Sequence, residues 1–597
     1  MATHPLRYRA STHLAQHAFL NILPRVVRFR PRTLLVCLWF FFAVTACAPP
    51  QHDKTSAVLP VDDQPNILLI LVDDLGWSDL GSFGGEISTP NLDELAVGGL
   101  RFTDFNTAPT CSPTRAMLLS GVDNHLSGLG NMAEELGPNQ QGRPGYEGFL
   151  NDRVVSIANL LSQAGYRTMM SGKWHLGHSI ELGPESRGFK DTFVLPGGGN
   201  HFNNNRAIYI GGDTNVVSKV RYRENGEWTE LPEDYYSSAY FTDKMIEFLS
   251  GHHQRAPDQP FFAFASYHAP HWPLQAPDAF IDKYQGIYDD GYEPIRQKRF
   301  SRLKQLGLIK DEVELTVSSL WPAWDELDEQ TQAKESRRMQ VYAGMVEALD
   351  FHIGRLIDYL EDSNELSNTV IIFMSDNGAE GNDVHHIVPG NAQWIAENFD
   401  NSIANMGKAN SYIGYGPRWA EVSMTPFRGF KGHVNQGGIV SPAFISHPHF
   451  QRQREIYPGY VSVMDIFPTL MEIAGLEPTP APGKIPHEGE SLLSLLNATN
   501  ANLHATDHIS ATELFNRRSV RQGDWKLVWQ EPPYGTNGWQ LYDLASDPAE
   551  INDVSKGNPI KHAELIALWQ QYEQDKNVII DPLLDLKYSS TNRHFEY

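Results

Sequence analysis

The sequence predicts an α/β protein with a large, mixed but mostly parallel sheet flanked by helices, and a smaller C-terminal α+β domain. Three observations support this class. Four short runs are apolar almost throughout, which is typical of strands buried on both faces. Segments with helical periodicity lie between the runs, and this alternation favours parallel strands. From about residue 500, the pattern becomes that of antiparallel strands followed by a helix.

The N-terminal 47 residues are expected to be an export signal. The basic segment RVVRFRPR precedes an apolar stretch at 33–46 that is too short for a stable bilayer span. VTAC at 44–47 resembles a bacterial lipobox, so we expect lipid on Cys47 and a linker at 48–63. Plain cleavage after ACA is the alternative, although Pro49 would then follow the cleaved bond. The expected location is the bacterial cell envelope, in the periplasm, with a lipid anchor in the outer membrane.

The four apolar runs predict adjacent strands of the main domain, which we assign to residues 64–499. Helical patterns at 154–165 and 345–360 come before the second and fourth runs. Ligand sites in such sheets lie beyond the carboxyl ends of the strands, and polar or charged residues follow each run. The runs are NILLILV (66–72), YRTMMS (166–171), FFAFAS (261–266) and TVIIFMS (369–375).

The C-terminal domain is assigned to residues 500–597. The segments 518–530 and 539–548 are typical of antiparallel strands, and 561–576 has the pattern of an amphipathic helix. A proline-rich segment at 476–486 lies just before the predicted boundary.

The charge of the chain limits its partners. The formal net charge is −24, and residues 1–46 carry six arginines and no acids, which leaves 42 basic and 72 acidic residues, or −30, for the rest. Such a body repels nucleic acid and anionic lipid at long range. We therefore expect no nucleic-acid partner and membrane contact only through the lipid anchor. An anionic substrate would need basic residues gathered at its own site.

Two strand ends carry candidate metal ligands. Asp73 and Asp74 follow the first run, and Asp376 and Asn377 follow the fourth. Carboxylate and amide oxygens suit hard cations such as Ca²⁺ or Mg²⁺. Adjacent acids also occur as helix caps, so the first pair alone is weak evidence. Together, the two strand ends predict a site for a hard divalent cation.

A second set of candidates is basic. If the strands are adjacent, several of these residues converge on one crevice, where they would bind a small anion with tetrahedral oxygens. Taken singly, each is more often a solvated surface residue. His268 is treated as a neighbour of this set, without a catalytic role. The set is Arg115, Lys173, His175, His271 and Lys431.

Cys111 is the one cysteine left after Cys37 and Cys47 are assigned to the N-terminal segment, so no internal disulfide is expected. Ser112 is expected to cap a short helix with Pro113 at its first position. Cys111 would then lie at a helix N-terminus, where an anion is favoured. A buried apolar role is the alternative, and the polar surroundings argue against it.

Five motifs together resemble the type I sulfatases, whose cysteine is oxidised to formylglycine (3-oxoalanine). CSPTR at 111–115 fits the C-x-P-x-R signature, and SGKWHLG at 171–177 resembles the second signature. The Asp73–Asp74 strand end, APHWPLQAP (269–277) and SDNGAEG (375–381) follow the family order. The resemblance covers roughly residues 64–575, is closest to bacterial arylsulfatases, and implies an alkaline-phosphatase-like fold.

This resemblance implies hydrolysis of aryl-type sulfate monoesters to an alcohol or phenol and inorganic sulfate. The aldehyde made from Cys111 hydrates, one hydroxyl attacks sulfur, and the other lets the resulting ester collapse. A formylglycine-generating enzyme is the implied maturation partner. One Ca²⁺ per chain would be held by Asp73, Asp74, Asp376, Asn377 and the modified Cys111.

The resemblance also implies a role for each remaining residue. Asp376 would be the base for the attacking hydroxyl, and Arg115 would support the deprotonated diol. Lys173, His271 and Lys431 would bind sulfate oxygens, with His271 or Lys431 protonating the leaving oxygen. His175 would remove the proton that triggers collapse.

Two other functions remain open at this point. A phosphate or phosphonate ester hydrolase could use the same scaffold, because these esters share the tetrahedral shape of sulfate. An inactive envelope protein that binds sulfated glycans would require the loss of a catalytic residue, and none is visibly lost. A further hypothesis concerns residues 384–426, which could form an aromatic rim beside the cleft or simply pack. Its aromatic residues include Trp394, Phe399, Tyr412, Tyr415 and Trp419.

Overall fold

The computed structural model describes residues 64–203, 220–316, 320–385, 391–477 and 482–582. The predicted signal, Cys47 and the linker 48–63 lie outside the described residues, so their assignment stays a prediction. Among the described residues, no helix is long and apolar enough to cross a membrane.

The main sheet has ten strands in the order β11-β2-β10-β9-β1-β8-β4-β5-β6-β7. The four predicted runs are β1 (Asn66–Asp73), β4 (Arg167–Lys173), β8 (Phe261–Pro270) and β9 (Thr369–Ser375). They are neighbours in the order β9-β1-β8-β4, and every pair among them is parallel. The mixed character comes from the edges, where β10 is antiparallel to both of its neighbours. The other strands are β2 (Leu100–Phe102), β5 (Asp191–Leu195), β6 (Tyr222–Glu224), β7 (Glu227–Thr229), β10 (Ala443–Ser446) and β11 (Glu455–Tyr457).

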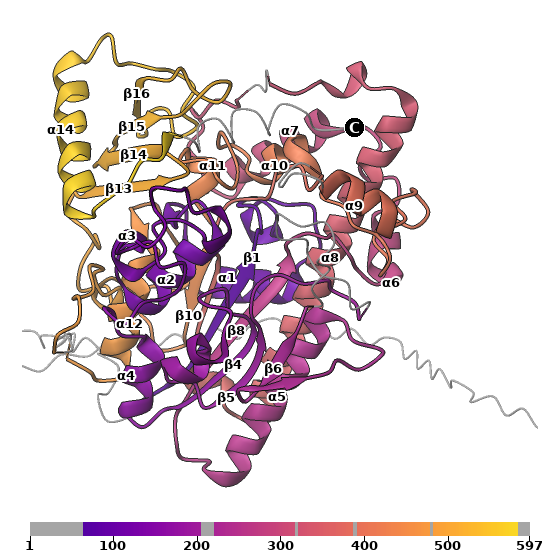
Figure 1. Ribbon diagram of the computed structural model, residues 1–597, viewed down its shortest axis with the longest axis vertical. Helices are drawn as coiled ribbons and strands as arrows, with labels where there is room; N and C mark the ends of the chain where they lie inside the picture. Colours follow the sequence, from indigo (N-terminus) through magenta and orange to yellow (C-terminus); the bar gives the residue numbers. More distant parts are fainter. Residues whose placement is uncertain (1–63, 204–219, 317–319, 386–390, 478–481, 583–597) are drawn as a thin grey trace, which may run out of the picture. The chain divides into compact units, whose positions relative to one another are not determined.

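Helices cover both faces of this sheet, as Figure 1 shows. Successive side chains of β1 alternate between two hydrophobic clusters, because a strand points its residues to opposite faces. One cluster includes α1 (Pro90–Gly98), α5 (Ser237–Arg255) and α8 (Glu329–Asp362). The other includes α2 (Cys111–Ser120), α4 (Ile157–Gln163) and α12 (Ile466–Ile473).

The predicted helices are present with shifted bounds. The pattern at 154–165 corresponds to α4, and the pattern at 345–360 is the second half of α8. Helix α8 starts at Glu329 because the Asp328 side chain accepts a hydrogen bond from the Thr331 backbone N–H, 2.7 Å away. The remaining elements are α3 (Asn124–Ser127), α6 (Asp278–Ile281), α7 (Tyr292–Gln305), α9 (Asn391–Asn398), α10 (Gly416–Ser423), α11 (Gln436–Ile439), α13 (Leu493–Leu496), β3 (Phe105–Asn106) and β12 (Val461–Ser462).

A separate four-stranded antiparallel sheet lies near the C-terminal end of the described chain. Its strands are β13 (Ile509–Leu514), β14 (Arg517–Gln522), β15 (Trp525–Trp529) and β16 (Trp539–Asp543), paired in that order. Helix α14 (Pro559–Asp575, yellow in Figure 1) packs on it through Leu565 and Trp569. The predicted fold class is therefore confirmed, while the domain boundary at residue 500 stays a prediction.

Candidate active site

The carboxyl ends of the four central strands deliver the predicted polar residues to one edge of the sheet. In the strand register, Val72 is level with Ser375, and Gly172 and Leu71 are both level with Ser266. The residues that follow these positions therefore emerge side by side. They are Asp73 and Asp74, Asp376 and Asn377, Lys173, and the histidines at the end of β8.

Cys111 is the first residue of α2 and is 1 % exposed. The expectation that Ser112 caps this helix is wrong, because Thr110 holds the N-cap position and the Thr114 N–H already bonds back to the Thr110 carbonyl. Among the described residues, the Ser112 hydroxyl has no hydrogen-bond partner. Pro113 is still tolerated there because the first-turn N–H groups need no partner within the helix. The helix therefore starts two residues earlier than a Ser112 cap would place it, with Cys111 rather than Pro113 as its first residue.

Cys111 lies beside a cation and two acids. The Lys173 ammonium Nζ is 3.7 Å from Cys111 Sγ. Sγ and one carboxylate oxygen each of Asp73 and Asp376 all lie within 4.8 Å of one another. Burial raises the pKa of the Cys111 thiol, although Lys173 and Lys431 act to lower it. The sulfur therefore lies within the same group as the predicted metal and anion ligands.

Arg115 lies four residues after Cys111 in α2 and connects the strand ends through hydrogen bonds and ion pairs. Its Nε and Nη2 donate to Asp376 Oδ2 at 3.0 and 2.8 Å, and Nη2 is 3.7 Å from Asp73 Oδ2. Its Nη1 donates to the Lys173 carbonyl at 2.9 Å and to Ser266 Oγ at 2.7 Å. A planar fork of donors suits this arrangement, since one side chain contacts residues at the ends of four strands, β1, β4, β8 and β9.

The two lysines each pair with a different acid of the Asp73–Asp74 strand end. Lys173 Nζ lies 2.5 Å from Asp73 Oδ2, and Lys431 Nζ lies 2.7 Å from Asp74 Oδ1. Lys431 is also 3.1 Å from Glu380, which was not among the predicted site residues. Burial would lower the pKa of both lysines, but the carboxylates raise it. Both lysines are therefore cations positioned to attract an anion.

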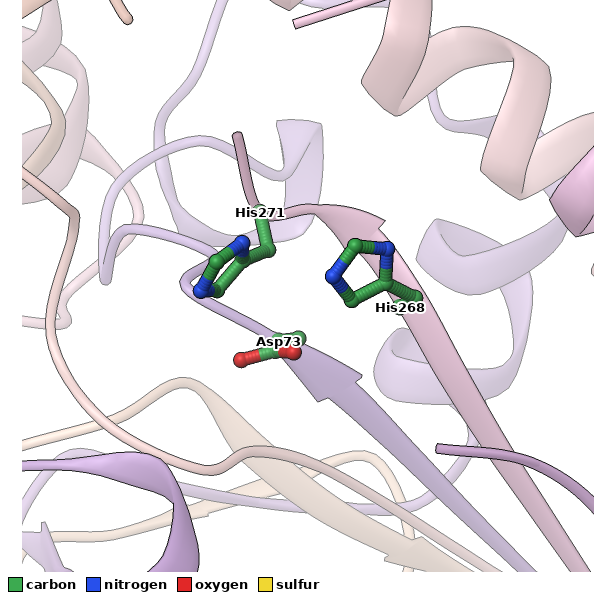
Figure 2. A group of neighbouring side chains, drawn as sticks. All are labelled: Asp73, His268 and His271. Carbon is green, nitrogen blue, oxygen red and sulfur yellow. The ribbon is translucent and has the colours of Figure 1, made fainter. Parts of the chain in front are cut away.

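Two histidines from the end of β8 stand beside Asp73, as Figure 2 shows. One ring nitrogen of His268, one of His271 and a carboxylate oxygen of Asp73 lie within 4.8 Å of one another. His271 Nε2 is 3.7 Å from Asp74 Oδ2, and the His268 ring stacks on His201 with centroids 4.6 Å apart. Burial, together with the positive charge of Lys173, lowers the pKa of His271 well below its usual value.

His268 contributes to the wall of the site, whereas the sequence indicated only a neighbouring residue. It is 1 % exposed, and neither of its ring nitrogens has a hydrogen-bond partner among the described residues. Burial lowers its pKa well below the usual value, which favours the neutral ring. It lies between His201 and His271, and therefore forms part of the wall of the site.

His175 is held by a residue outside the predicted set. Its Nε2 lies 3.0 Å from Glu134, and its backbone takes a φ of 57°. Asp74 also has a positive φ, of 68°. Such left-handed backbone at residues with side chains is uncommon and often marks functional sites. Among the described residues, His175 Nδ1 has no hydrogen-bond partner.

Four further residues contact the predicted set and were not predicted from the sequence: Glu134, His201, Ser266 and Glu380. Glu380 could have been found, because it lies four residues after Asp376 in the same polar segment. Ser266 ends the predicted run 261–266, so its place at the sheet edge could also have been found. Glu134 and His201 come from segments with no local signal, and their partners are set by tertiary packing alone.

The described residues of the segment 384–426, which are 384–385 and 391–426, divide into two parts. Trp394, Phe399 and Tyr412 form a small buried cluster with Trp272, whose ring is 4.7 Å from that of His271. Trp419 instead lies in the main core, where its Nε1 donates to the Glu335 carbonyl at 3.0 Å. Ordinary packing therefore accounts for Trp419, while the first cluster lies next to the site.

The donor set fits a hard divalent cation. Asp73 Oδ1 and Asn377 Oδ1 are buried acceptors without a hydrogen-bond partner among the described residues. Burial and neighbouring carboxylates raise the pKa of Asp74 and of Asp376. The cations Arg115, Lys173 and Lys431 thus face four acids, Asp73, Asp74, Asp376 and Glu380. Ca²⁺ is bound by several oxygen ligands, and this site has more carboxylates than side-chain cations, so it suits Ca²⁺.

The cations and acids of this cluster suit a hydrolase of esters with a tetrahedral anion, and comparisons with known proteins identify the class as sulfuric ester hydrolases. The family model described as Sulfatase matches residues 65–476. An uncharacterized sulfatase of Schizosaccharomyces pombe is 42% identical over 538 residues, which are 87% of this chain and 95% of that protein. The arylsulfatase of Klebsiella aerogenes is 38% identical over 426 residues, covering 71% of this chain and 89% of that protein.

Solved structures share the fold. The crystal structure of Ps i-CgsB matches with a TM-score of 0.62 at 23% identity, covering 88% of this chain and 97% of that one. The chain belongs to the sulfatase family, as its five motifs predicted. It hydrolyses sulfate esters, the reaction that this family performs.

Proposed function

We propose that the protein hydrolyses aryl-type sulfate monoesters, using Ca²⁺ and a formylglycine made from Cys111. The observation that carries this proposal is the surroundings of the Cys111 sulfur, which is 3.7 Å from Lys173 and within 4.8 Å of oxygens of Asp73 and Asp376. The likeness to the Klebsiella aerogenes arylsulfatase supports the aryl class.

Ca²⁺ and the aldehyde made from Cys111 would each supply one kind of chemistry. Ca²⁺ would be held by Asp73, Asp74, Asp376 and Asn377, and would act as a Lewis acid toward the sulfate. The aldehyde that replaces the Cys111 thiol would supply, once hydrated, an oxygen nucleophile.

The chain's own residues would bind the ester and move protons. Lys173, Lys431 and His271 line the site and would hold sulfate oxygens, lowering the energy of the charge that develops in the transition state. Asp376, fixed by two hydrogen bonds from Arg115, would accept the proton of the nucleophile. His271 or Lys431 would protonate the leaving oxygen. His175 Nδ1, with the opposite nitrogen held by Glu134, would take the proton in the release step.

The test of the nucleophile combines two variants with one mass measurement. Cys111→Ser and Cys111→Ala should each lower kcat for an aryl sulfate roughly 10³-fold or more, since the group that attacks sulfur is lost. Mass spectrometry of the peptide containing residues 111–115 should show the mass of an aldehyde in place of the thiol. Unchanged turnover in either variant would contradict this role for Cys111.

The test of the substrate compares a sulfate with a phosphate on the same leaving group. We expect kcat/KM for 4-nitrophenyl sulfate to exceed that for 4-nitrophenyl phosphate. The reverse order would favour the phosphate or phosphonate ester hydrolase. No turnover of either by the aldehyde-bearing protein would favour the sulfated-glycan-binding alternative. Removing Ca²⁺ with a chelator should abolish activity, and adding Ca²⁺ should restore it.

We also propose that the protein is a periplasmic lipoprotein anchored through Cys47 and matured by a formylglycine-generating enzyme. The basic and apolar pattern before VTAC supports the export step. Cys47→Ser should move the protein from the membrane fraction to the soluble fraction after cell lysis, and an unchanged distribution would contradict the anchor.

A further inference from the structure

Three side chains that can bind a metal meet outside the candidate active site. They are Glu490, which precedes α13, and His504 and His508, which lie just before β13. One ligand atom from each lies within 4.8 Å of the others. The two imidazole rings have centroids 4.1 Å apart, and His504 Nδ1 is 3.1 Å from Glu490 Oε1. This group joins the segment after α12 to the segment that enters the C-terminal sheet.

The histidines border a cavity of about 190 Å³. Tyr460, Asp465 and Glu488 also line this cavity. Its volume exceeds that of a water molecule severalfold, so an ion with a bound water can be accommodated. The cavity shares no lining residue with the predicted active-site set.

A buried carboxylate fixes the ring of His504. Asp465 is fully buried and lies 2.8 Å from His504 Nε2. It is itself held by the backbone N–H groups of Ser462 and Glu490, which donate to it at 2.7 and 2.8 Å. Metal-binding histidines commonly use their second nitrogen in this way, since the carboxylate sets the tautomer and the orientation of the ring. In this case Nδ1 is the nitrogen left to face Glu490 and His508.

We propose that Glu490, His504 and His508 bind a transition-metal ion of the zinc class. Two imidazoles and one carboxylate suit such an ion, and three protein ligands leave a fourth position for water. In a tetrahedral zinc site, neighbouring ligand atoms are about 3.3 Å apart, and the distance of 3.1 Å between His504 and Glu490 is close to this value. A ring nitrogen of His508 lies within 4.8 Å of the other two ligand atoms and would complete the site by moving toward them.

The bound ion would link the two sheet-bearing parts of the chain. Glu490 is tied through its backbone to Asp465, at the start of α12, and His508 directly precedes β13. An ion that binds both residues in the folded state only would stabilise the fold by mass action. Its role is structural, and it is independent of the sulfatase proposal.

The test measures Zn²⁺ binding to the full-length protein after chelation and reloading with Ca²⁺. The variant His508→Asn removes one ligand but leaves the contacts of His504 with Asp465 and Glu490 in place. The matched control is His253→Asn on α5, which removes a half-exposed histidine that pairs with Glu365. Bound zinc is counted by elemental mass spectrometry, affinity is measured by calorimetry, and Tm is measured with and without Zn²⁺.

Wild type and His253→Asn should each bind one more Zn²⁺ than His508→Asn, or bind it at least about 100-fold more tightly. The reason is that removing even a residue that only hydrogen-bonds to a metal ligand lowers metal affinity roughly 10–100-fold. Zn²⁺ should raise Tm in these two proteins and not in His508→Asn. Aryl sulfate hydrolysis without Zn²⁺ should be equal in all three. Equal stoichiometry and affinity in wild type and His508→Asn would overturn the proposal. So would a lack of zinc binding in wild type, which would leave His504 as a cation bridging two carboxylates.

Discussion

Single residues in the active site are coupled through shared charges. Asp73 illustrates this coupling, because burial would raise its pKa while Lys173, His271 and Arg115 hold it well below the usual value. Arg115 pairs with residues at four strand ends and is 1 % exposed. Loss of Arg115 would therefore leave the buried carboxylate of Asp376 without its ion pair.

Replacing Arg115 with alanine should lower the free energy of unfolding by about 3–5 kcal/mol, because Asp376 would remain buried and unpaired. Arg452→Ala is the control, since Arg452 pairs with the half-exposed Glu455 at 2.9 Å, and an exposed pair contributes at most about 1 kcal/mol. Urea unfolding measures both. Equal losses in the two variants would contradict the picture of Arg115 as the buried hub of the site.

Residues that end a buried strand could be predicted from the sequence, and their partners could not. Asp73, Lys173 and Asp376 each follow an apolar run, so the rule for the carboxyl ends of strands places them together. Glu134 and His201 follow no such run. They reach His175 and the His268–His271 pair through tertiary contacts, which no local pattern specifies.

At the scale of elements, long buried strands were predicted and short edge strands were not. Strands β2, β10 and β11 have only three or four residues, too few to show a period. The first half of α8 is rich in polar residues, so its apolar stripe becomes visible only near Met345. The antiparallel edge and the full length of α8 therefore had to come from the structure.

Helix α3 is joined to the C-terminal sheet through His125. Its ring nitrogens lie 3.0 Å from Asp123 and 3.0 Å from Glu513 of β13, and the Tyr572 hydroxyl of α14 bonds to Asp123 at 2.9 Å. Burial alone would lower the pKa of His125, but these two carboxylates raise it to about 9. The charged histidine therefore stabilises the folded state.

The resulting pH dependence has a definite sign. Because the folded pKa of about 9 lies above the unfolded value of 6.5, the contribution is complete below pH 6.5 and is lost as pH rises through 9. The shift corresponds to about 3 kcal/mol. The difference in unfolding free energy between wild type and His125→Gln should shrink by about this amount across the window. A difference that is constant with pH would contradict a charged His125.

The two aromatic parts of the segment 384–426 should respond differently to mutation. Trp419→Ala should lower the unfolding free energy by about 3–5 kcal/mol, because it leaves a cavity in the main core. Trp394→Ala removes a ring from the cluster that packs on Trp272 beside His271, and should raise KM for bulky aryl sulfates. Steady-state kinetics and urea unfolding on both variants separate the two effects. An unchanged KM for every ester in Trp394→Ala would end the idea of an aromatic rim.

The negative net charge of the whole molecule repels anionic sulfate esters, whereas the cations of the active site attract them. The net charge of −24 acts at long range, whereas the three cations of the site act only within it. Raising NaCl from about 10 to about 150 mM shortens the Debye length from about 30 to about 8 Å. We therefore expect kcat/KM for an aryl sulfate to increase with salt, and to increase more for a polyanionic ester. A decrease would show that the local cations dominate the approach.

Because folding buries Cys111, another protein can modify its sulfur only before folding is complete. The side chain is 1 % exposed, and its neighbour Lys431 belongs to a segment synthesised much later. A visiting enzyme can reach the thiol only while the newly made polypeptide is still open, before the last strands and loops close over it. Faster folding shortens that interval. A faster-folding variant would therefore yield a larger fraction of folded molecules in which Cys111 is still an unmodified thiol.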